Sequence, residues 1–272
     1  MTTEIRHSAV QRTPGATLPA LFIGHGSPTN ALGGNGFADY LGQLGRDLPR
    51  PAAILCVSAH WVTDGPRVLF AERPKTIHDF HGFPPELYRL DYPAPGAPAL
   101  AARALELLAP HGAQAASDWG LDHGAWAVLL HLYPLADIPV LQVSLDARRS
   151  LREHLELARA LRPLRREGVL ILGSGNLTHN LRAVDWQPGA TPRGWAVEFD
   201  RKVADAVLAG DVESLVDPRA FGAQLWRQAH PTLEHYQPLL YALGAREESD
   251  AVSFPYEEMQ MGTLSMRSLR VG

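Results

Sequence analysis

The sequence predicts an α/β domain with a central, mostly parallel sheet flanked by helices. Short apolar runs alternate along the chain with longer segments in which apolar residues recur every three or four positions. Glycine, proline, serine or aspartate bounds the short runs, which is typical of buried strands. No shift in composition marks a second domain in the 272 residues. We therefore expect a flexible N-terminal tail over residues 1–17 and one domain over residues 18–272.

Four apolar runs are expected to form the buried strands, namely residues 18–24, 52–58, 138–145 and 169–173. Each is nearly continuous in hydrophobic residues, as strands are when helices cover both faces of a parallel sheet. Residues 252–255 and 263–271 show shorter alternating patterns. These two segments are expected to add antiparallel strands at the edge of the sheet.

Helical periodicity predicts helices over residues 97–108, 150–166, 195–208 and 233–243. Ser150 and Glu153 form a capping-box pattern at the start of the second of these. Gly112 and Gly168 follow two of the elements as stop signals. A further helix is expected to begin at His123, after Asp122, which could cap the helix or orient a neighbouring imidazole.

Composition excludes several classes of protein. The net charge of −4 argues against a nucleic-acid binder, and the longest apolar runs are too short to span a membrane. The single cysteine, Cys56, can form neither an internal disulfide nor a cysteine-rich zinc site. Residues 1–17 lack the apolar stretch of a signal peptide, so we expect a cytoplasmic protein.

Three histidines follow predicted strands at equivalent places. His25 ends the first apolar run, His60 comes just after the second, and His179 follows the fourth. Ligands of open α/β sheets bind at the carboxyl ends of the strands, and neutral imidazole is a common ligand of zinc and iron. The pattern therefore predicts a metal site assembled by the sheet from distant segments.

The remaining histidines divide by their local context. Thr232 could cap a helix whose first turn carries Glu234 and His235, and both of these side chains are candidate ligands. His123 is a candidate acid, base or substrate-binding group. The others are expected to be pocket-wall, packing or surface residues: His78 and His81 structural or at a pocket wall, His230 at a pocket wall or the surface, His131 in helix packing, and His7, His111 and His154 on the surface.

Eight phrases, in order along the chain, resemble those of a known family. They are GHGSP (24–28), SAHW (58–61), TIHDFHGFP (76–84), YPAPG (92–96), LDHGAW (121–126), GSGNLTHN (173–180), HPTLEHY (230–236) and MGTLSM (261–266). From Leu18 onward, the sequence is similar to the class III extradiol ring-cleavage dioxygenases, and within them to the DOPA 4,5-dioxygenase branch.

The resemblance implies roles for five histidines. Positions matching His25, His60 and His235 are metal ligands in that branch, and the one matching His179 either ligates the metal or serves as a base. The position matching His123 contacts substrate. Other members of the class use two histidines and one glutamate, so the ligand set is open between His235 and Glu234.

The implied reaction inserts O₂ into a small aromatic diol, with ring cleavage beside the diol to a muconic semialdehyde. Fe(II) is the expected metal because zinc is redox-inert, although Zn(II) is an alternative occupant of the same site. His179, if off the metal, would take the catechol proton, and His123 would steer a proton later in the reaction. Five aromatic residues are available either to wall the substrate or to pack in the core: Trp61, Phe83, Tyr88, Tyr92 and Trp126.

Two alternatives remain at this stage, a zinc-dependent hydrolase and a non-enzymatic binding protein that retains the metal pocket. The expected partners are the aromatic diol and O₂. We expect the protein to bind neither nucleic acid nor a membrane. The identity of the catechol and the formation of a homo-oligomer are left open.

Overall fold

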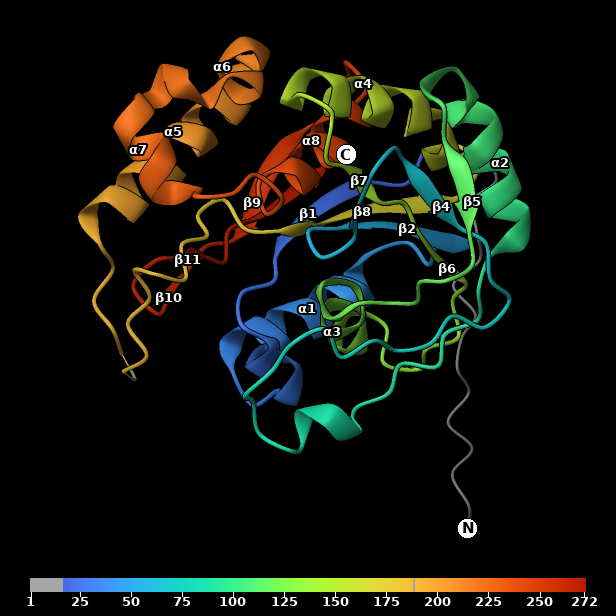
Figure 1. Ribbon diagram of the computed structural model, residues 1–272, viewed down its shortest axis with the longest axis horizontal. Helices are drawn as coiled ribbons and strands as arrows, with labels where there is room; N and C mark the ends of the chain where they lie inside the picture. The colour runs from blue at the N-terminus through green and yellow to red at the C-terminus, as the bar shows by residue number, and fades with distance from the viewer. Residues whose placement is uncertain (1–16, 188) are drawn as a thin grey trace.

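A computed structural model describes residues 17–187 and 189–272, so most of the expected tail over residues 1–17 lies outside the described residues. The centre is a six-stranded mixed sheet (Figure 1). Its strands, in spatial order, are β6 (Val140–Gln142), β2 (Ala53–Ser58), β8 (Val169–Gly175), β1 (Ala20–Gly24), β12 (Ser268–Val271) and β9 (Val252–Tyr256). The expected α/β class is confirmed.

The four strands predicted from apolar runs form the parallel part of the sheet. β6, β2, β8 and β1 pair in parallel, whereas β12 pairs antiparallel with both β1 and β9. The antiparallel strands expected at the C-terminal end are thus also confirmed. Three short pairs lie outside this sheet: β3 (Val62–Thr63) with β7 (Leu145–Asp146), β4 (Arg67–Leu69) with β5 (Gln114–Ala116), and β10 (Met259–Gln260) with β11 (Leu264–Ser265).

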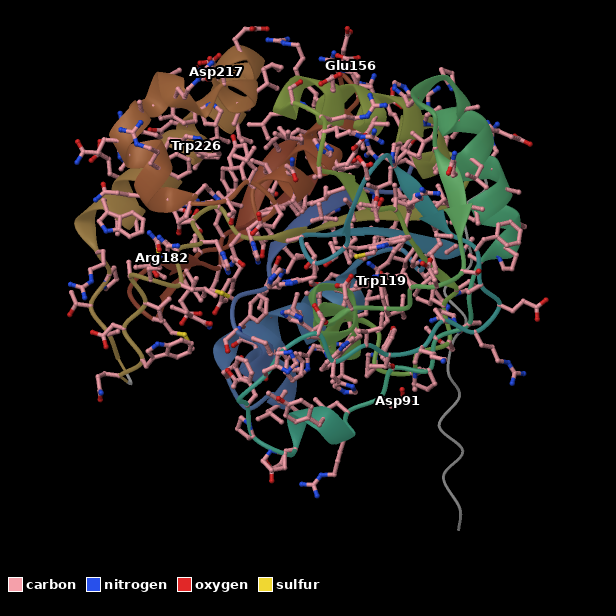
Figure 2. All side chains as sticks on the ribbon, viewed as in Figure 1. Asp91, Trp119, Glu156, Arg182, Asp217 and Trp226 are labelled. Atoms are coloured by element: carbon pink, nitrogen blue, oxygen red, sulfur yellow. The ribbon has the colours of Figure 1, made fainter. Side chains whose placement is uncertain are left out.

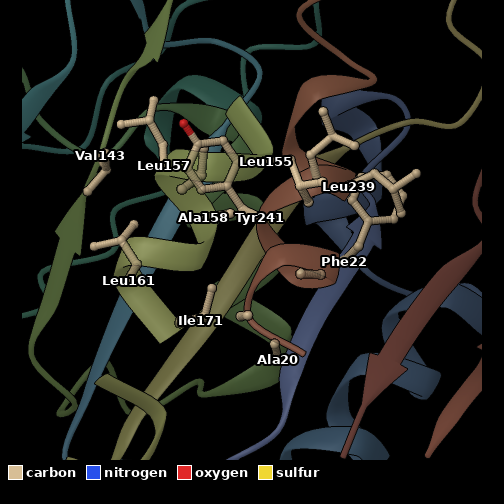
Figure 3. Packing of buried hydrophobic residues seen from close by; sticks show 14 of the residues in the cluster. Ala20, Phe22, Val143, Leu155, Leu157, Ala158, Leu161, Ile171, Leu239 and Tyr241 are labelled. Atoms are coloured by element: carbon tan, nitrogen blue, oxygen red, sulfur yellow. The ribbon is translucent and has the colours of Figure 1, made fainter. Parts of the chain in front are cut away.

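Helices cover both faces of the sheet, which explains why β1, β2 and β8 are buried throughout (Figure 1). One face carries α4 (Leu151–Leu161) and α8 (Gln237–Gly244), with α2 (Pro98–Leu108) beside α4. The other face carries α1 (Gly36–Asp47) and α3 (His123–Leu132). Figure 3 shows how Leu155 and Leu161 of α4 pack over Ile171 of β8 on the first face.

The other helices lie along the α8 side of the sheet. α5 (Gly194–Ala209), α6 (Val212–Val216) and α7 (Ala223–Ala229) form a cluster near the top left of Figure 2, where Trp226 is labelled. The ring of Phe199 packs against that of Trp226 in this cluster. Short 3-10 helices are formed by residues Pro28–Leu32, Leu87–Arg89, Ala109–His111, Arg162–Arg165 and Pro218–Phe221. Among the described residues, no helix combines the length and the apolar character needed to cross a membrane.

Local signals placed most helix ends correctly. Ser150 and Glu153 form the predicted capping box, and Asp122 caps α3 by accepting from the backbone N–H of Ala125. The prediction for Thr232 is wrong, because α8 begins only at Gln237 and the Thr232 hydroxyl donates to Glu234 instead. Glu234 and His235 therefore lie in a loop rather than in a helical turn.

Candidate metal centre

The predicted histidines meet at the carboxyl edge of the parallel strands. His25 directly follows β1, and its backbone N–H donates to the carbonyl of Gly175 at the end of β8. His60 lies just beyond β2, and His179 lies in the segment after β8. The imidazole centroids of His25 and His60 are 5.1 Å apart. Parallel pairing of β1, β8 and β2 is thus what brings these distant segments together.

The loop after α7 adds the fourth histidine. The carbonyl of His235 accepts the backbone N–H of Asn176, directly after β8. A Cβ on Gly175 would lie 2.2 Å from that carbonyl oxygen, so only glycine allows the loop to approach the strand this closely. The His235 imidazole lies 5.3 Å from that of His25 and 5.0 Å from that of His60, measured between centroids.

Hydrogen bonds set the tautomer of His25. Its Nδ1 lies 2.9 Å from the Ser174 hydroxyl, and that hydroxyl donates to the carbonyl of Gly124 at 2.5 Å. Because the hydroxyl proton is used in this way, the serine oxygen accepts the Nδ1–H of His25. The lone pair of His25 then resides on Nε2, the nitrogen that faces the other histidines.

Carboxylates orient His60 and His235 so that, as in His25, Nδ1 carries the proton and Nε2 the lone pair. Nδ1 of His60 is 3.4 Å from Asp79, and Nδ1 of His235 is 3.3 Å from Glu234. A carboxylate only accepts, so each Nδ1 carries the proton and each Nε2 offers a lone pair. The sequence left the choice between His235 and Glu234 open; here His235 joins His25 and His60, with Glu234 behind it.

The resulting donor set fits a metal ion. One nitrogen from each of His25, His60 and His235 lies within 4.8 Å of the other two. The Nε2 atoms of His25 and His60 are 3.2 Å apart, and two lone pairs at this distance repel unless a cation accepts both. Nε2 of His235 is buried without a hydrogen-bond partner among the described residues. Such an orphaned buried acceptor is costly unless it binds an ion.

Burial also keeps these imidazoles neutral, the form that binds metals. Burial, followed by the proximity of the other histidines, lowers the pKa of His25 and of His235 well below the ordinary value. The same two causes lower the pKa of His60 to about 3, despite the nearby charge of Asp79. At neutral pH all three nitrogens are therefore free to donate a lone pair.

Asp79 links the three convergent histidines to His123. One carboxylate oxygen accepts the backbone N–H of His123 at 2.8 Å, and the other lies 2.9 Å from Nδ1 of that residue and 3.4 Å from Nδ1 of His60. Burial alone would raise the pKa of Asp79, but the hydrogen bonds from His123 and the proximity of His60 hold it below the ordinary value. The centroid of His123 is 3.9 Å from that of His60.

His179 occupies a different position from the other three. Its ring is stacked on that of His235, and it groups with Glu234 and His235 rather than with His25 and His60. Burial, with a further effect of His123, lowers its pKa to about 4. His179 is thus a neutral imidazole at the edge of the set, able to accept a proton.

The histidines line a cleft of about 390 Å³, a size that suits a small aromatic molecule. Of the aromatic residues expected to wall the substrate, only Phe83 lines it, together with Phe80, His81 and Trp186. The other four do not line the cleft. Trp126 and Tyr92 are core residues, Trp61 stacks on Trp119 (labelled in Figure 2), and Tyr88 packs behind Phe80.

Two further histidine predictions are wrong. His230 lies neither at the pocket wall nor on the surface, because it is buried among aromatic rings of α5 and α7. Its Nε2 forms a hydrogen bond with the carbonyl oxygen of Leu177. His154 was expected on the surface, yet it is fully buried between Tyr241 and the carbonyl of Asp146.

Comparison with known proteins identifies the class to which this fold and site belong. Residues 33–268 match the family model for the catalytic LigB subunit of aromatic ring-opening dioxygenase. The chain therefore belongs to this family, and it is an enzyme, an extradiol ring-cleaving dioxygenase. This is the function expected from the eight phrases, and the hydrolase and the binding protein are not favoured.

Particular relatives span nearly the whole chain. A 4,5-DOPA dioxygenase extradiol of Escherichia coli (strain K12) is 46% identical over 257 residues, which cover 94% of this chain and 95% of the relative. One from Beta vulgaris is 39% identical over 256 residues, 92% of this chain and 94% of the relative. The crystal structure of an uncharacterized protein from Escherichia coli K12 superposes with a TM-score of 0.82 at 41% identity, covering 94% of this chain and 100% of that chain.

Proposed function

We propose that the enzyme cleaves a catechol beside its diol, adding both atoms of O₂ to give a muconic semialdehyde. The observation that carries this proposal is the set of three imidazole nitrogens, on His25, His60 and His235, whose lone pairs converge in a cleft of catechol size. The word DOPA in the names of the relatives makes a 4-substituted catechol the first substrate to test.

We further propose Fe(II) as the working metal, held by His25, His60 and His235, with His179 as a fourth ligand or a neighbouring base. When bound, Fe(II) would bring the diol and O₂ together and let electron density pass between them, whereas Zn(II) could occupy the site but not do this. Three imidazole ligands, two of them oriented by the carboxylates of Asp79 and Glu234, are suited to bind a divalent cation of this kind.

Two histidines are proposed to move protons. His179 is a neutral imidazole at the edge of the set, so its position allows it to accept a catechol proton. His123 receives its orientation from Asp79, which accepts its Nδ1–H and leaves Nε2 to interact with substrate oxygen. Phe80 and Phe83 would hold the flat ring and exclude water from it.

Anaerobic reconstitution with Fe(II), followed by oxygen uptake with 4-methylcatechol, tests the proposal. One O₂ consumed for each catechol, with a yellow product, is the expected result. The zinc-loaded protein serves as the control and should consume none. Absence of both uptake and product from the iron-loaded protein would contradict the catechol assignment.

Residues 18–272 are proposed to form the catalytic domain. A cytoplasmic location, the absence of nucleic-acid and membrane partners, and self-association can be tested by fractionation and by light scattering.

A further inference from the structure

Asp122 carries a carboxylate that water does not reach. Its side chain is 0% exposed, and the hydrogen-bond donors that the described residues offer it are all uncharged. A buried charge without a cationic partner is costly for folding. The cap of a helix needs only one acceptor oxygen, and at α4 the exposed Ser150 supplies it. Capping of α3 alone therefore does not account for a buried aspartate at this position.

The first carboxylate oxygen of Asp122 reaches the strand end that precedes His60. Oδ1 accepts the Ser58 hydroxyl at 2.6 Å as well as the backbone N–H of Ala125 at 3.2 Å. Ser58 is the last residue of β2, and its hydroxyl oxygen accepts the backbone N–H of His60 at 3.1 Å. Two hydrogen bonds in series thus join the start of α3 to the backbone of His60.

The second carboxylate oxygen fixes Asp122 itself. Oδ2 accepts Nε2–H of Gln142 at 2.7 Å and the indole N–H of Trp119 at 3.3 Å. Gln142 is the last residue of β6, and its amide oxygen accepts the backbone N–H of Asp122 at 3.2 Å. Trp119 (labelled in Figure 2) stacks on Trp61, the residue after His60. A fully bonded buried carboxylate of this kind is held rigidly against the ends of β2 and β6.

A ring of hydrogen bonds closes around His60 and His123. On the side-chain part of this ring, the Asp79 carboxylate lies 3.4 Å from Nδ1 of His60 and 2.9 Å from Nδ1 of His123. On the backbone part, Asp122 and Ser58 join the chain just before His123 to the N–H of His60. The two imidazoles, with centroids 3.9 Å apart, are thus tied to each other through both their side chains and their backbones.

The first turn of α3 packs closely against the end of β2. A Cβ on Gly124 would lie 2.4 Å from Oγ of Ser58 and 3.0 Å from Cδ2 of His60, so only glycine allows this approach. The carbonyl of Gly124 also accepts the Ser174 hydroxyl, which sets the tautomer of His25. The turn that begins at Asp122 is therefore in contact with the supports of two of the convergent histidines.

We propose that Asp122 is a positioning residue that acts through Ser58. It fixes His60, a proposed metal ligand, relative to His123, the imidazole proposed to face the substrate. This role rests on the proposed function and adds to it a residue on which both metal affinity and turnover depend. Without the link, His60 is free to shift relative to His123, which weakens the metal site and misplaces a group that moves a proton.

The test separates the link to Ser58 from the cap of α3. In Asp122→Ser the shorter side chain still caps the helix but no longer reaches Ser58. The dissociation constant for Zn(II), measured on the full-length protein by competition with a chelator, should rise about 10- to 100-fold, the usual cost of losing such a support. In the Fe(II)-reconstituted enzyme, kcat for 4-methylcatechol per bound iron should fall by a similar factor, while KM changes by less than about threefold.

Three further variants make the test specific. Ser58→Ala removes the middle of the link and should reproduce both losses, and its combination with Asp122→Ser should cost little more than either change alone. Asp122→Asn keeps an acceptor oxygen for Ser58 and should recover most of what Asp122→Ser loses. Ser150→Ala is the matched control: it removes the N-cap of α4 and should lower Tm without changing the Zn(II) dissociation constant or kcat.

Three outcomes would overturn the inference. The first is parental Zn(II) affinity and kcat in Asp122→Ser and Ser58→Ala, because Asp122 would then only cap α3. The second is an Asp122→Asn protein as impaired as Asp122→Ser, which would make the charge rather than the link responsible. The third is full additivity of the two losses in the double variant.

Two further results are also decisive. If Asp122→Ser does not fold, Ser58→Ala and Asp122→Asn decide the matter by the same two measurements. If the Zn(II) dissociation constants follow the expected order but the iron-loaded parent opens no catechol ring, the proposed function fails and the positioning role of Asp122 stands.

Discussion

The ring of His179 lies flat against the ring of His235, with centroids 3.4 Å apart and planes 5° apart. Two parallel rings at this distance cannot both direct a nitrogen at the point where His25 and His60 converge unless one of them turns. The stack therefore separates the positions of the two rings: His235 completes the convergent set, and His179 stands beside it.

His179→Ala should keep its iron and lose turnover. Removal of a positioned proton acceptor typically lowers kcat by about 10²–10⁴-fold, with little change in KM when KM reflects binding. Rates are normalised to bound iron measured by elemental analysis. Iron content that falls as far as in a ligand variant would show instead that His179 turns and ligates the metal.

His25→Ala and His235→Ala should each lose most of their bound metal. Each change removes one of three convergent nitrogens. His131→Gln is the control, because His131 contacts the carbonyl of Asn30 and lies outside the donor set. Metal per chain is measured after purification in the presence of excess Fe(II) and removal of free ion. Full retention by both alanine variants would refute the ligand assignment.

Asp79→Asn should reduce turnover about 10- to 100-fold, the usual cost of losing a carboxylate that orients a ligand or a catalytic imidazole. The amide could donate to Nδ1 of His123 and so favour the wrong tautomer. His123→Ala alone should cost about 10²–10⁴-fold in kcat. If Asp79 acts through His123, adding Asp79→Asn to His123→Ala should cost little more in kcat; two fully additive losses would indicate separate roles.

His154 should make stability depend on pH. Burial is the main cause that lowers the pKa of His154 to about 4 in the folded protein, whereas an unfolded chain has the ordinary value near 6.5. Between these values the unfolded state binds the proton first, so stability is lost as pH falls. Between pH 7 and pH 5 this group should remove about 2 kcal/mol from the free energy of unfolding. Urea titrations of the parent and of His154→Gln should differ by this amount; parallel pH profiles would contradict the prediction.

The strand ends were the part of the site that the sequence could predict. His25 and His60 each follow an apolar run, and an α/β sheet gathers the carboxyl ends of such runs at one edge. Asp79 was missed because it lies between Ile77 and Phe80 in a loop without periodicity, where neither helical nor strand spacing says which way a side chain points. Its place inside TIHDFHGFP was the one available signal.

The predictions for His154 and Thr232 were wrong because the structure around each residue overrides its local sequence pattern. His154 sits between Glu153 and Leu155 on a helix rich in charge, and charge alone suggested a solvated face. The approach of α8 covers that position and supplies Tyr241 as a hydrogen-bond partner. Thr232 offered a sound cap on local grounds, but Pro238 follows as an early residue of the actual helix and places its start later.

The order of the three convergent imidazoles along the chain bears on how the protein is made. His25 and His60 emerge early from the ribosome, while His235 emerges only after β8 and the α5–α7 cluster have been synthesised. A nascent chain that has not reached this loop holds two of the three nitrogens and cannot form the complete donor set. A metal ion that needs all three nitrogens can therefore be held only after the loop that carries His235 has been synthesised.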